Sequence, residues 1–536
     1  MSDAVVIGSG PNGLVCANLL ADAGWSVTVL EEQDEPGGAV RSDHAVDPDY
    51  VSDMFSAFYP LAAASPIIAS LGLDRYGLRW SHAPHVLAHP LPDGRCAVLD
   101  RDPGTTAANL NGFAPGDGEA WLDLCRGWDK VAGPVLDALF TPFPPVRAAA
   151  TLAARVRAAG GLRFVRELLL PVRRLGEEKF AGEGGRLLLA GNALHADLTP
   201  EAAGSGGFGW LMSMLGQSHG FPVPVGGAGA LTDALVARLR DRGGSLRCGQ
   251  PVTEVVVRGG RALGVRTADG DAVRARHAVL ADVSAPHLYR DLVAERYLPS
   301  RVHEDLRRFA WDFATFKVDW ALDRPMPWTA PEAAGAGTVH LADGVDALTR
   351  FAAQLATGHV PDQPFLLFGQ MTTADPTRSP AGTESAWAYT HVPHEVRGDA
   401  GDEGLTGRWN ERETEAMADR MEKQAERYAP GFRDRIRGRR ILAPPTLQAA
   451  DANLHDGAIN GGTAALHQQL LFRPLPGTGR PETPVTGLYL ASASAHPGGG
   501  VHGAPGANAA RAALRARGPL HTAAVAAQRA LTQRKR

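Results

Sequence analysis

The chain has few cysteines and no long apolar run. Its four cysteines lie far apart and include no Cys-x-x-Cys pair, so neither a disulfide framework nor a dithiol redox centre is indicated. No uninterrupted apolar stretch approaches the ~20 residues of a membrane-spanning helix. The first apolar strand begins almost at Met1, leaving no room for a signal or transit peptide. We therefore expect a cytoplasmic protein.

A strong charge of either sign is also absent. The 54 basic and 58 acidic residues leave a net charge of −4 on 536 residues. No basic groove interleaved with aromatic residues appears, as a nucleic-acid-binding surface would require, so nucleic acid is not an expected partner. A chain of this length exceeds one compact core, and two or more domains are expected.

Metal-binding patterns are lacking as well. Histidines gather in residues 82–89 and again in 391–394, but Pro84 and Pro393 interrupt the two runs. Neither run can form the helical His-Glu-x-x-His face that zinc chemistry uses. The sequence therefore predicts no metal site.

What the sequence does contain is a complete nucleotide-binding βαβ unit at its start. An apolar strand leads into a glycine-rich turn at residues 8–13, and a second strand ends at Glu31. Gly8 permits the tight turn, Gly10 lets the backbone approach a pyrophosphate, and Gly13 lets the helix pack on the strand. The phosphates would rest on the helix N-terminus, and the carboxylate of Glu31 would accept the ribose hydroxyls.

The residues after Glu31 favour FAD over NAD. They complete an E-x5-G-G-x-x-R pattern that ends at Arg41 and resembles the FAD oxidoreductases of the flavin amine oxidase and phytoene desaturase superfamily. In that superfamily the second glycine pair and the arginine line the pyrophosphate and the flavin. No motif supplies a covalent link, so non-covalent FAD is predicted. The predicted contacts in this region are Gly8, Gly10, Pro11, Asn12, Gly13, Glu31, Glu32, Gly38 and Arg41.

A second nucleotide-domain block covers residues 230–281. An amphipathic helix over 231–239 is followed by strands, a hairpin at Gly259-Gly260 and a short buried strand at 278–281. The resemblance implies that this block completes the FAD domain, with Val252 touching the adenine. The glycines of 226–230 do not form a second dinucleotide fingerprint, because prolines break the preceding residues and no third glycine follows.

The third block combines a strand at 486–492, a glycine-rich loop at 495–506 and a helix from about 507 to 516. The loop offers free backbone N–H groups and a positive dipole end, which suit the anionic edge of a reduced flavin. We predict that Gly499, Gly500 and Val501 contact this edge. His496 lies in the same loop, where it would act either as a base or as a hydrogen-bonding support of the loop.

Several further motifs occur in order along the chain, at 375–382, 428–432, 459–462 and 468–474. Together with the third block they make the chain similar to the phytoene-desaturase-related branch of the superfamily, from Asp3 to about Arg515. The likeness weakens at residues 453–456 and in the basic C-terminal tail. The resemblance implies a mitochondrial location for some eukaryotic relatives in this branch. No transit peptide is seen in the present sequence.

The expected architecture is α/β, with a discontinuous Rossmann-like FAD-binding domain of the GR2 type and an α+β substrate domain. The FAD domain would comprise residues 1–80, 222–295 and 480–520. The substrate domain would comprise 81–221 and 296–479, followed by a basic tail at 521–536.

The resemblance implies an oxidoreductase in which flavin N5 accepts a hydride from an apolar, isoprenoid- or carotenoid-like substrate. Oxygen or a quinone is the expected electron acceptor, since no second dinucleotide site was found. Two alternatives remain open: a redox-neutral FAD-dependent isomerase, and a non-enzymatic flavoprotein that acts through protein partners.

Peripheral membrane contact is predicted for residues 134–175. This segment holds seven arginines and only two carboxylates in a chain that is acidic overall. A basic face beside an apolar stripe is typical of helices that lie on anionic lipid, although most such stripes pack on a domain core. The stripe consists of Leu152, Val156, Phe164, Leu168 and Val172.

Overall fold

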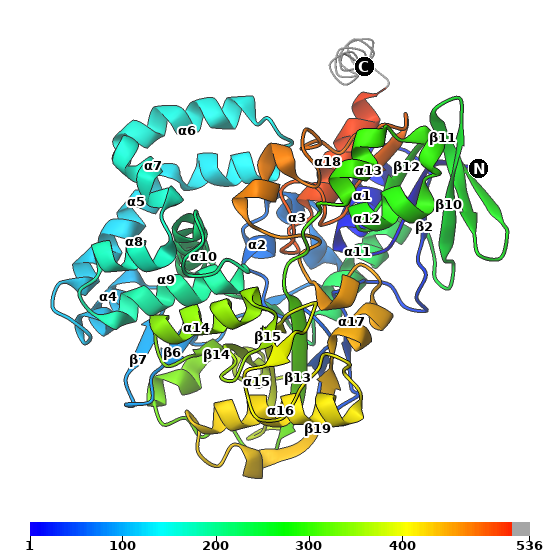
Figure 1. Ribbon diagram of the computed structural model, residues 1–536. Coiled ribbons are helices and arrows are strands. Elements are labelled where there is room, and N and C mark those ends of the chain that lie inside the picture. Colours follow the sequence, from blue (N-terminus) through cyan, green and yellow to red (C-terminus); the bar gives the residue numbers. More distant parts are fainter. Residues whose placement is uncertain (517–536) are drawn as a thin grey trace.

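The structure, a computed structural model, describes residues 1–516. It contains two seven-stranded sheets, which lie side by side with helices packed around them (Figure 1). The basic tail expected at 521–536 lies outside the described residues. Along the described chain, no helix is both long and apolar enough to cross a bilayer.

The first sheet has the order β10-β11-β12-β1-β2-β9, with β20 beside β12. Its parallel part brings the carboxyl ends of β12, β1 and β2 to one edge, where nucleotides bind in sheets of this kind. The antiparallel strands β10 and β11 extend β12 outwards. The strands are β1 (Ser2–Ile7), β2 (Val27–Leu30), β9 (Ser245–Arg247), β10 (Val252–Arg258), β11 (Arg261–Thr267), β12 (Ala272–Ala281) and β20 (Leu488–Leu490).

Three helices cover one face of this sheet: α1 (Pro11–Asp22), α11 (Gly229–Asp241) and α18 (Ala504–Arg515). Helix α1 packs against both of the others. A Cβ atom on Gly506 would lie 1.9 Å from the carbonyl oxygen of Asn12, so α18 can approach the start of α1 only because this residue is glycine. A second apolar cluster covers the opposite face of this sheet. It includes residues of α12 (Ala285–His287) and α13 (Ser300–Leu306).

Three element boundaries differ from the sequence-based expectation. Strand β12 has ten residues rather than the four predicted at 278–281, because its first half pairs with β11 at the surface and alternates in burial. The strand expected at 486–492 is limited to Leu488–Leu490. Helix α18 starts three residues earlier than expected, at Ala504, with Pro505 in its first turn.

The second sheet has the order β19-β13-β17-β16-β14-β6-β7. One face packs on α16 (Glu411–Glu426), and the opposite face packs on α9 (Glu183–His195) and α10 (Ser205–His219). Successive side chains of a strand point to opposite faces, and β6, β7, β16 and β17 accordingly contribute apolar side chains to both clusters. The strands are β6 (His85–Pro90), β7 (Cys96–Leu99), β13 (Ala314–Leu322), β14 (Ala336–Leu341), β16 (Leu366–Gln370), β17 (Glu384–Val392) and β19 (Ile436–Leu442).

Helices between β7 and α9 form an outer layer on the left of Figure 1. These are α4 (Pro103–Asn111), α5 (Asp117–Phe140), α6 (Val146–Ala158), α7 (Leu162–Leu169) and α8 (Val172–Lys179), with α14 (Val345–Ala356) beside α9. Short helices are α2 (Pro60–Ala63), α3 (Pro66–Ser70), α15 (Met371–Ala374) and α17 (Pro444–Ala450). Two-residue strands are β3 (Ser42–Asp43), β4 (Ser52–Asp53), β5 (Trp80–Ser81), β8 (Val223–Pro224), β15 (His359–Val360) and β18 (Gly398–Asp399).

Candidate cofactor and substrate site

The predicted phosphate turn joins the carboxyl end of β1 to the start of α1. Gly8 has a φ of +88°, and a Cβ atom there would lie 2.8 Å from the carbonyl oxygen of Asp282. A Cβ on Gly13 would lie 2.4 Å from the carbonyl oxygen of Gly8, so both positions require glycine. Gly10 is the N-cap of α1 and Pro11 is its first residue, with no side chain capping the helix. The turn therefore presents backbone N–H groups at the positive end of a 12-residue helix.

Glu31 follows β2 and is only 6% exposed. Its Oε2 accepts hydrogen bonds from the backbone N–H and the hydroxyl of Ser9, at 2.8 and 2.7 Å, and its Oε1 accepts one from Gln33 N at 3.0 Å. A carboxylate has about four acceptor positions, so these contacts orient Glu31 without exhausting it. Its neighbour Glu32 is exposed.

The second glycine pair lies directly against the phosphate turn. Gly38 has a φ of +54°, and a Cβ there would lie 3.1 Å from the Cα of Gly10. Arg41 donates to the carbonyl oxygens of Gly38 and Ala450, at 3.0 and 2.7 Å, and its guanidinium lies 5.4 Å from the centroid of the Phe55 ring. The residues of the E-x5-G-G-x-x-R pattern are therefore gathered around one turn.

Sequence reasoning missed two carboxylates at this turn. Asp282 directly follows β12, and its Oδ2 accepts the backbone N–H of Gly13 at 2.7 Å. Burial, together with the charges of Asp451 and Glu31, raises the pKa of Asp282 to about 7, although the Gly13 hydrogen bond lowers it. Asp451 Oδ2 lies 3.3 Å from the position of a Cβ on Gly38, and burial raises its pKa to about 6. The position of Asp282 after an apolar strand was a signal that could have found it.

The residues around the turn fit the pyrophosphate and ribose of a dinucleotide. The glycines leave a cradle that a Cβ would fill, and the Oδ1 of Asn12 is buried without a hydrogen-bond partner. Glu31 follows β2, at the position predicted for the ribose contact. Val252 begins β10. The nearby Gln250 donates its backbone N–H to the carbonyl oxygen of Glu31 at 2.7 Å, so this segment lies at the predicted ribose end.

The loop predicted to hold the flavin, residues 495–506, lies between β20 and α18, and the structure ends it at residue 503, directly before α18 begins. A Cβ on Gly499 would lie 3.0 Å from Asn460 Oδ1, and one on Gly500 would lie 2.5 Å from Leu61 Cδ1. Val501 adopts a φ of +55°, a left-handed conformation that is rare for a β-branched residue.

Two histidines of this loop have different environments. His502 Nε2 lies 3.1 Å from the carbonyl oxygen of Gly499, and its Nδ1 accepts the N–H of Ala504 at 3.1 Å. His502, which the sequence did not single out, therefore fixes the loop. His496 packs edge-on against Phe143 at 6.3 Å, and burial lowers its pKa to about 4.

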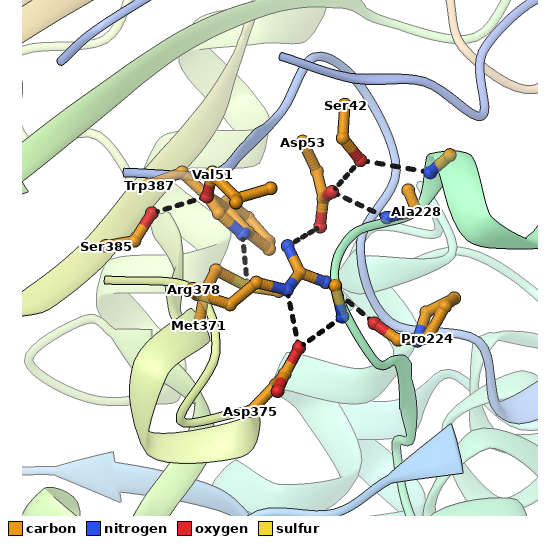
Figure 2. A network of polar contacts seen from close by, with 12 residues as sticks. Ser42, Val51, Asp53, Pro224, Ala228, Met371, Asp375, Arg378, Ser385 and Trp387 are labelled. Atoms are coloured by element: carbon orange, nitrogen blue, oxygen red, sulfur yellow. Dashed lines mark hydrogen bonds and ion pairs between the residues drawn. The ribbon is translucent and has the colours of Figure 1, made fainter. Parts of the chain in front are cut away.

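The glycines of 226–230 take part in a polar network instead (Figure 2). Arg378 is completely buried and pairs with Asp53 and Asp375, both at 2.9 Å. The same carboxylates accept the backbone N–H groups of Ala228 and Gly226, each at 2.8 Å. The backbone N–H groups of Gly226 and Ala228 thus tie this loop to the buried Arg378 network.

Aromatic side chains of β17 line the face of the second sheet that is turned toward α9 and α10. Trp387 and Tyr389 stack with centroids 6.0 Å apart, and Phe58 from the N-terminal region lies 6.0 Å from Trp387. Phe368, on the neighbouring strand β16, packs into the opposite cluster beside α16. Lys317 Nζ lies 5.7 Å above the Trp387 ring, and burial lowers its pKa.

The segment expected to touch membranes packs largely on the protein. Phe164 and Val172 are buried in the core, and the other three residues of the predicted stripe are partly buried against it. Three of the predicted arginines, Arg166, Arg173 and Arg174, form ion pairs. The stripe named from the sequence is therefore not a free apolar face.

The two histidine runs do not form metal centres in the described part of the chain. Across residues 1–516, no group of three or more His, Cys, Asp or Glu side chains is arranged to hold a metal ion. His85 instead pairs with Asp100 at 2.8 Å.

Comparisons with known proteins agree with this arrangement. The sequence profile of the flavin containing amine oxidoreductase family matches residues 12–514. Pyridine nucleotide-disulfide oxidoreductase domain-containing protein 2 of Mus musculus is 30% identical, covering 96% of this chain and 93% of the mouse protein. A neurosporene-forming phytoene desaturase of Rhodobacter capsulatus is 25% identical, covering 94% of this chain and 91% of the relative.

Solved structures show the same fold. An oxidoreductase from Methanosarcina mazei superposes with a TM-score of 0.62 at 16% identity, covering 96% of this chain and 99% of the other. A variant of putrescine oxidase superposes with a TM-score of 0.58 at 15% identity, covering 98% and 99%. The predicted resemblance and α/β fold are confirmed. The chain belongs to the flavin containing amine oxidoreductase family, and it is an FAD-dependent oxidoreductase.

Proposed function

We propose that the protein removes a hydride from an apolar substrate, by desaturation or oxidation, with FAD bound non-covalently. The cofactor would lie in residues 1–80, 222–295 and 480–520, and the substrate in 81–221 and 296–479. Flavin chemistry supplies hydride acceptance at N5 when the cofactor is bound. The glycine turn and Glu31 would hold its dinucleotide end, Val252 its adenine, and the backbone of Gly499–Val501 the far edge of its ring.

The observation that carries this proposal is that the flavin loop and the aromatic face converge. Leu61 lies against Gly500 of the loop and also packs against the cluster that contains Trp387. Aromatic side chains give an apolar surface with defined geometry, and the cofactor's reactive atom must meet the substrate there. The resemblance to a phytoene desaturase supports an isoprenoid-like substrate.

Oxygen or a quinone is the proposed acceptor. Gly226 and Ala228 donate their backbone N–H groups to Asp375 and Asp53, which supports the absence of a nicotinamide site at this loop. His496 is proposed to act either as a base or as a structural support of the loop. Its lowered pKa favours a neutral ring at physiological pH.

The test is turnover by the purified flavoprotein with and without an acceptor. Phytoene-type polyenes, other isoprenoids and aliphatic amines would be supplied in detergent, and products identified by mass. Loss of two hydrogens that requires oxygen or a quinone is the expected result. Conversion at constant mass without an acceptor would establish the isomerase alternative, and no conversion of any class by a fully flavin-loaded protein would favour a non-enzymatic role.

Peripheral membrane contact remains a second proposal, at a surface different from the predicted stripe. On α7, Leu162 is 88% exposed and Leu169 is 56% exposed. Gly204 lies between this helix and Leu466. The N–H of Gly204 donates to Leu169 O at 3.0 Å, and a Cβ on Gly204 would lie 2.9 Å from Leu466 Cδ1. Leu470, also exposed, follows shortly after Leu466. Exposed apolar side chains beside arginines suit an anionic lipid surface.

Vesicle sedimentation would test this contact. Vesicles that contain anionic lipid should pellet the wild type at low salt, and the double variant Leu162→Ser, Leu169→Ser should pellet several-fold less. Leu263→Ser is the matched control, because Leu263 is exposed on β11 in the first sheet. Equal sedimentation of all three proteins would contradict the proposal, as would a wild type that stays in solution.

A further inference from the structure

Four histidines gather between α9 and the sheet face that carries the aromatic residues, and the charge of His391 acts on His195. His89 on β6, His340 on β14 and His391 on β17 are fully buried, and His195 ends α9. The ring centroids of His89 and His340 are 6.2 Å apart, and those of His340 and His195 are 5.7 Å apart. We call these four residues the imidazole row.

The inner end of the row reaches the predicted flavin loop. His391 Nε2 lies 2.7 Å from Asp197 Oδ1, and the side-chain amide of Asn460 donates to Asp197 Oδ2. The Oδ1 of Asn460 lies 3.0 Å from the position of a Cβ on Gly499. One amide side chain therefore separates the His391–Asp197 pair from the loop.

The outer end of the row reaches a surface cavity. His89 Nε2 lies 3.0 Å from the carbonyl oxygen of Ala342. The next residue, Asp343, lines a cavity of about 460 Å³ together with charged residues that include Arg173 and Arg350. The outer end of the row thus lies beside a segment of the cavity wall.

Several ring nitrogens in the row have no hydrogen-bond partner. They are Nδ1 of His89, Nδ1 of His195 and both nitrogens of His340. The nitrogens of His391 make no aligned hydrogen bond either, although its Nε2 lies within ion-pair distance of Asp197. Thr338 Oγ1, two residues before His340 on β14, is also buried and unpaired. Buried polar atoms are normally paired, and where no protein partner exists they commonly bind ordered water. An apolar substrate gives no reason to bury so many polar atoms here.

The rings differ in charge. Burial lowers the pKa of His89 and of His195 to about 4 and that of His340 further below its ordinary value. These three rings are therefore neutral near pH 7, each with one nitrogen able to donate and one able to accept. Burial lowers the pKa of His391, but the negative charges of Asp197 and Asp312 raise it. Their combined effect is larger than that of burial, so the pKa of His391 is raised. The charged form of His391 is thus favoured at the inner end of the row.

We propose that the imidazole row, with water bound at its unpaired nitrogens, is a proton path between the cavity beside Ala342 and His391. The inference rests on the proposed function. Oxidation of the substrate releases a hydride, which the cofactor takes, and a proton, which leaves the site. Reduction of oxygen to hydrogen peroxide, or of a quinone to a quinol, consumes that hydride and one proton. Each neutral ring passes a proton by accepting on one nitrogen and releasing from the other.

The first test follows protons and cofactor together. The holoprotein is photoreduced without substrate and mixed with oxygen in weakly buffered solution containing a pH-indicator dye. Proton uptake by the wild type should match cofactor reoxidation in rate and slow in D₂O. His340→Phe should slow proton uptake at least tenfold at unchanged flavin content and circular dichroism. His303→Phe is the matched control, because its Nε2 is also buried and unpaired but lies on α13, outside the row.

A second measurement does not depend on the flavin. NMR of protein with ¹⁵N-labelled histidine would follow the exchange of the His391 ring N–H with water. This exchange should be at least tenfold slower in His340→Phe. It should be equally slowed in His89→Leu, which interrupts the outer end of the row. His89→Leu also serves if His340→Phe does not fold. Rates within twofold of the wild type in folded variants would overturn the proton path. A protein that holds no FAD would refute the proposed function, while the exchange rates would still decide the path.

Discussion

Flavin binding should depend on pH through Asp282. The pKa of this carboxyl is raised to about 7 by burial, with Asp451 and Glu31 adding to the effect. Its Oδ2 accepts the N–H of Gly13, one of the donors predicted for the pyrophosphate. A cofactor that carries phosphate charges should therefore bind best when Asp282 is protonated, and above pH 7 each binding event should take up a proton.

The expected magnitude follows from this linkage. If bound FAD keeps Asp282 protonated, the apparent Kd rises about tenfold for each pH unit above 7, or roughly 2.7 kcal/mol by pH 9. Two unit charges about 4 Å apart repel by about 4 kcal/mol at an effective dielectric constant of 20. The repulsion exceeds the cost of protonation over this range, so proton uptake is the favoured response.

The assay is equilibrium dialysis of the apoprotein with FAD from pH 6 to 9 at constant ionic strength. Asp282→Asn should bind FAD with a nearly constant Kd and exceed the wild type in affinity at pH 9. Asp233→Asn is the control, because burial raises the pKa of Asp233 on α11 as well but no phosphate is predicted there. A flat profile for the wild type, or the same slope in Asp282→Asn, would refute the argument.

Three further predictions concern the cofactor and the fold. Gly13→Val should abolish flavin content, measured as the ratio of flavin to protein absorbance, since a Cβ there would lie 2.4 Å from Gly8 O; a yellow, fully loaded variant would contradict this. Arg378→Met should lower the stability by about 3–5 kcal/mol, because Asp53 and Asp375 keep buried charges without their partner; an unchanged midpoint in chemical denaturation would argue against it. NADPH should not reduce the flavin at a rate comparable with turnover, as judged by stopped-flow absorbance, and rapid bleaching would overturn the assignment of the acceptor.

The phosphate turn and its sheet were predictable because their signals are local. Gly8, Gly13, Glu31 and Arg41 lie within 34 residues of sequence, and each type of residue has a geometric reason to be there. The boundaries of β12 were less accessible. Its first half pairs with β11 at the surface, and the apolar pattern on which the prediction relied covers only the buried second half.

The polar interior between α9 and the second sheet could not be predicted from the sequence. Asp197 and His391 are 194 residues apart, and the pair forms because α9 packs on the second sheet. His89 and His340 approach through the parallel pairing of β6 with β14, which no local pattern indicates. From the sequence, no metal-binding role was predicted for His89 or His391. Only the tertiary arrangement shows that they belong to one row.

Asn460 connects these distant features. Its backbone N–H donates to Asp312 Oδ2 at 2.8 Å, its side-chain nitrogen donates to Asp197, and its side-chain oxygen faces Gly499. The amide has no charge to gain or lose, so it can hold the loop and the ion pair in a fixed relation while protons move at His391. The position of the flavin loop and the charge of the buried pair are therefore coupled through one side chain, and a shortened residue at 460 would disturb both together.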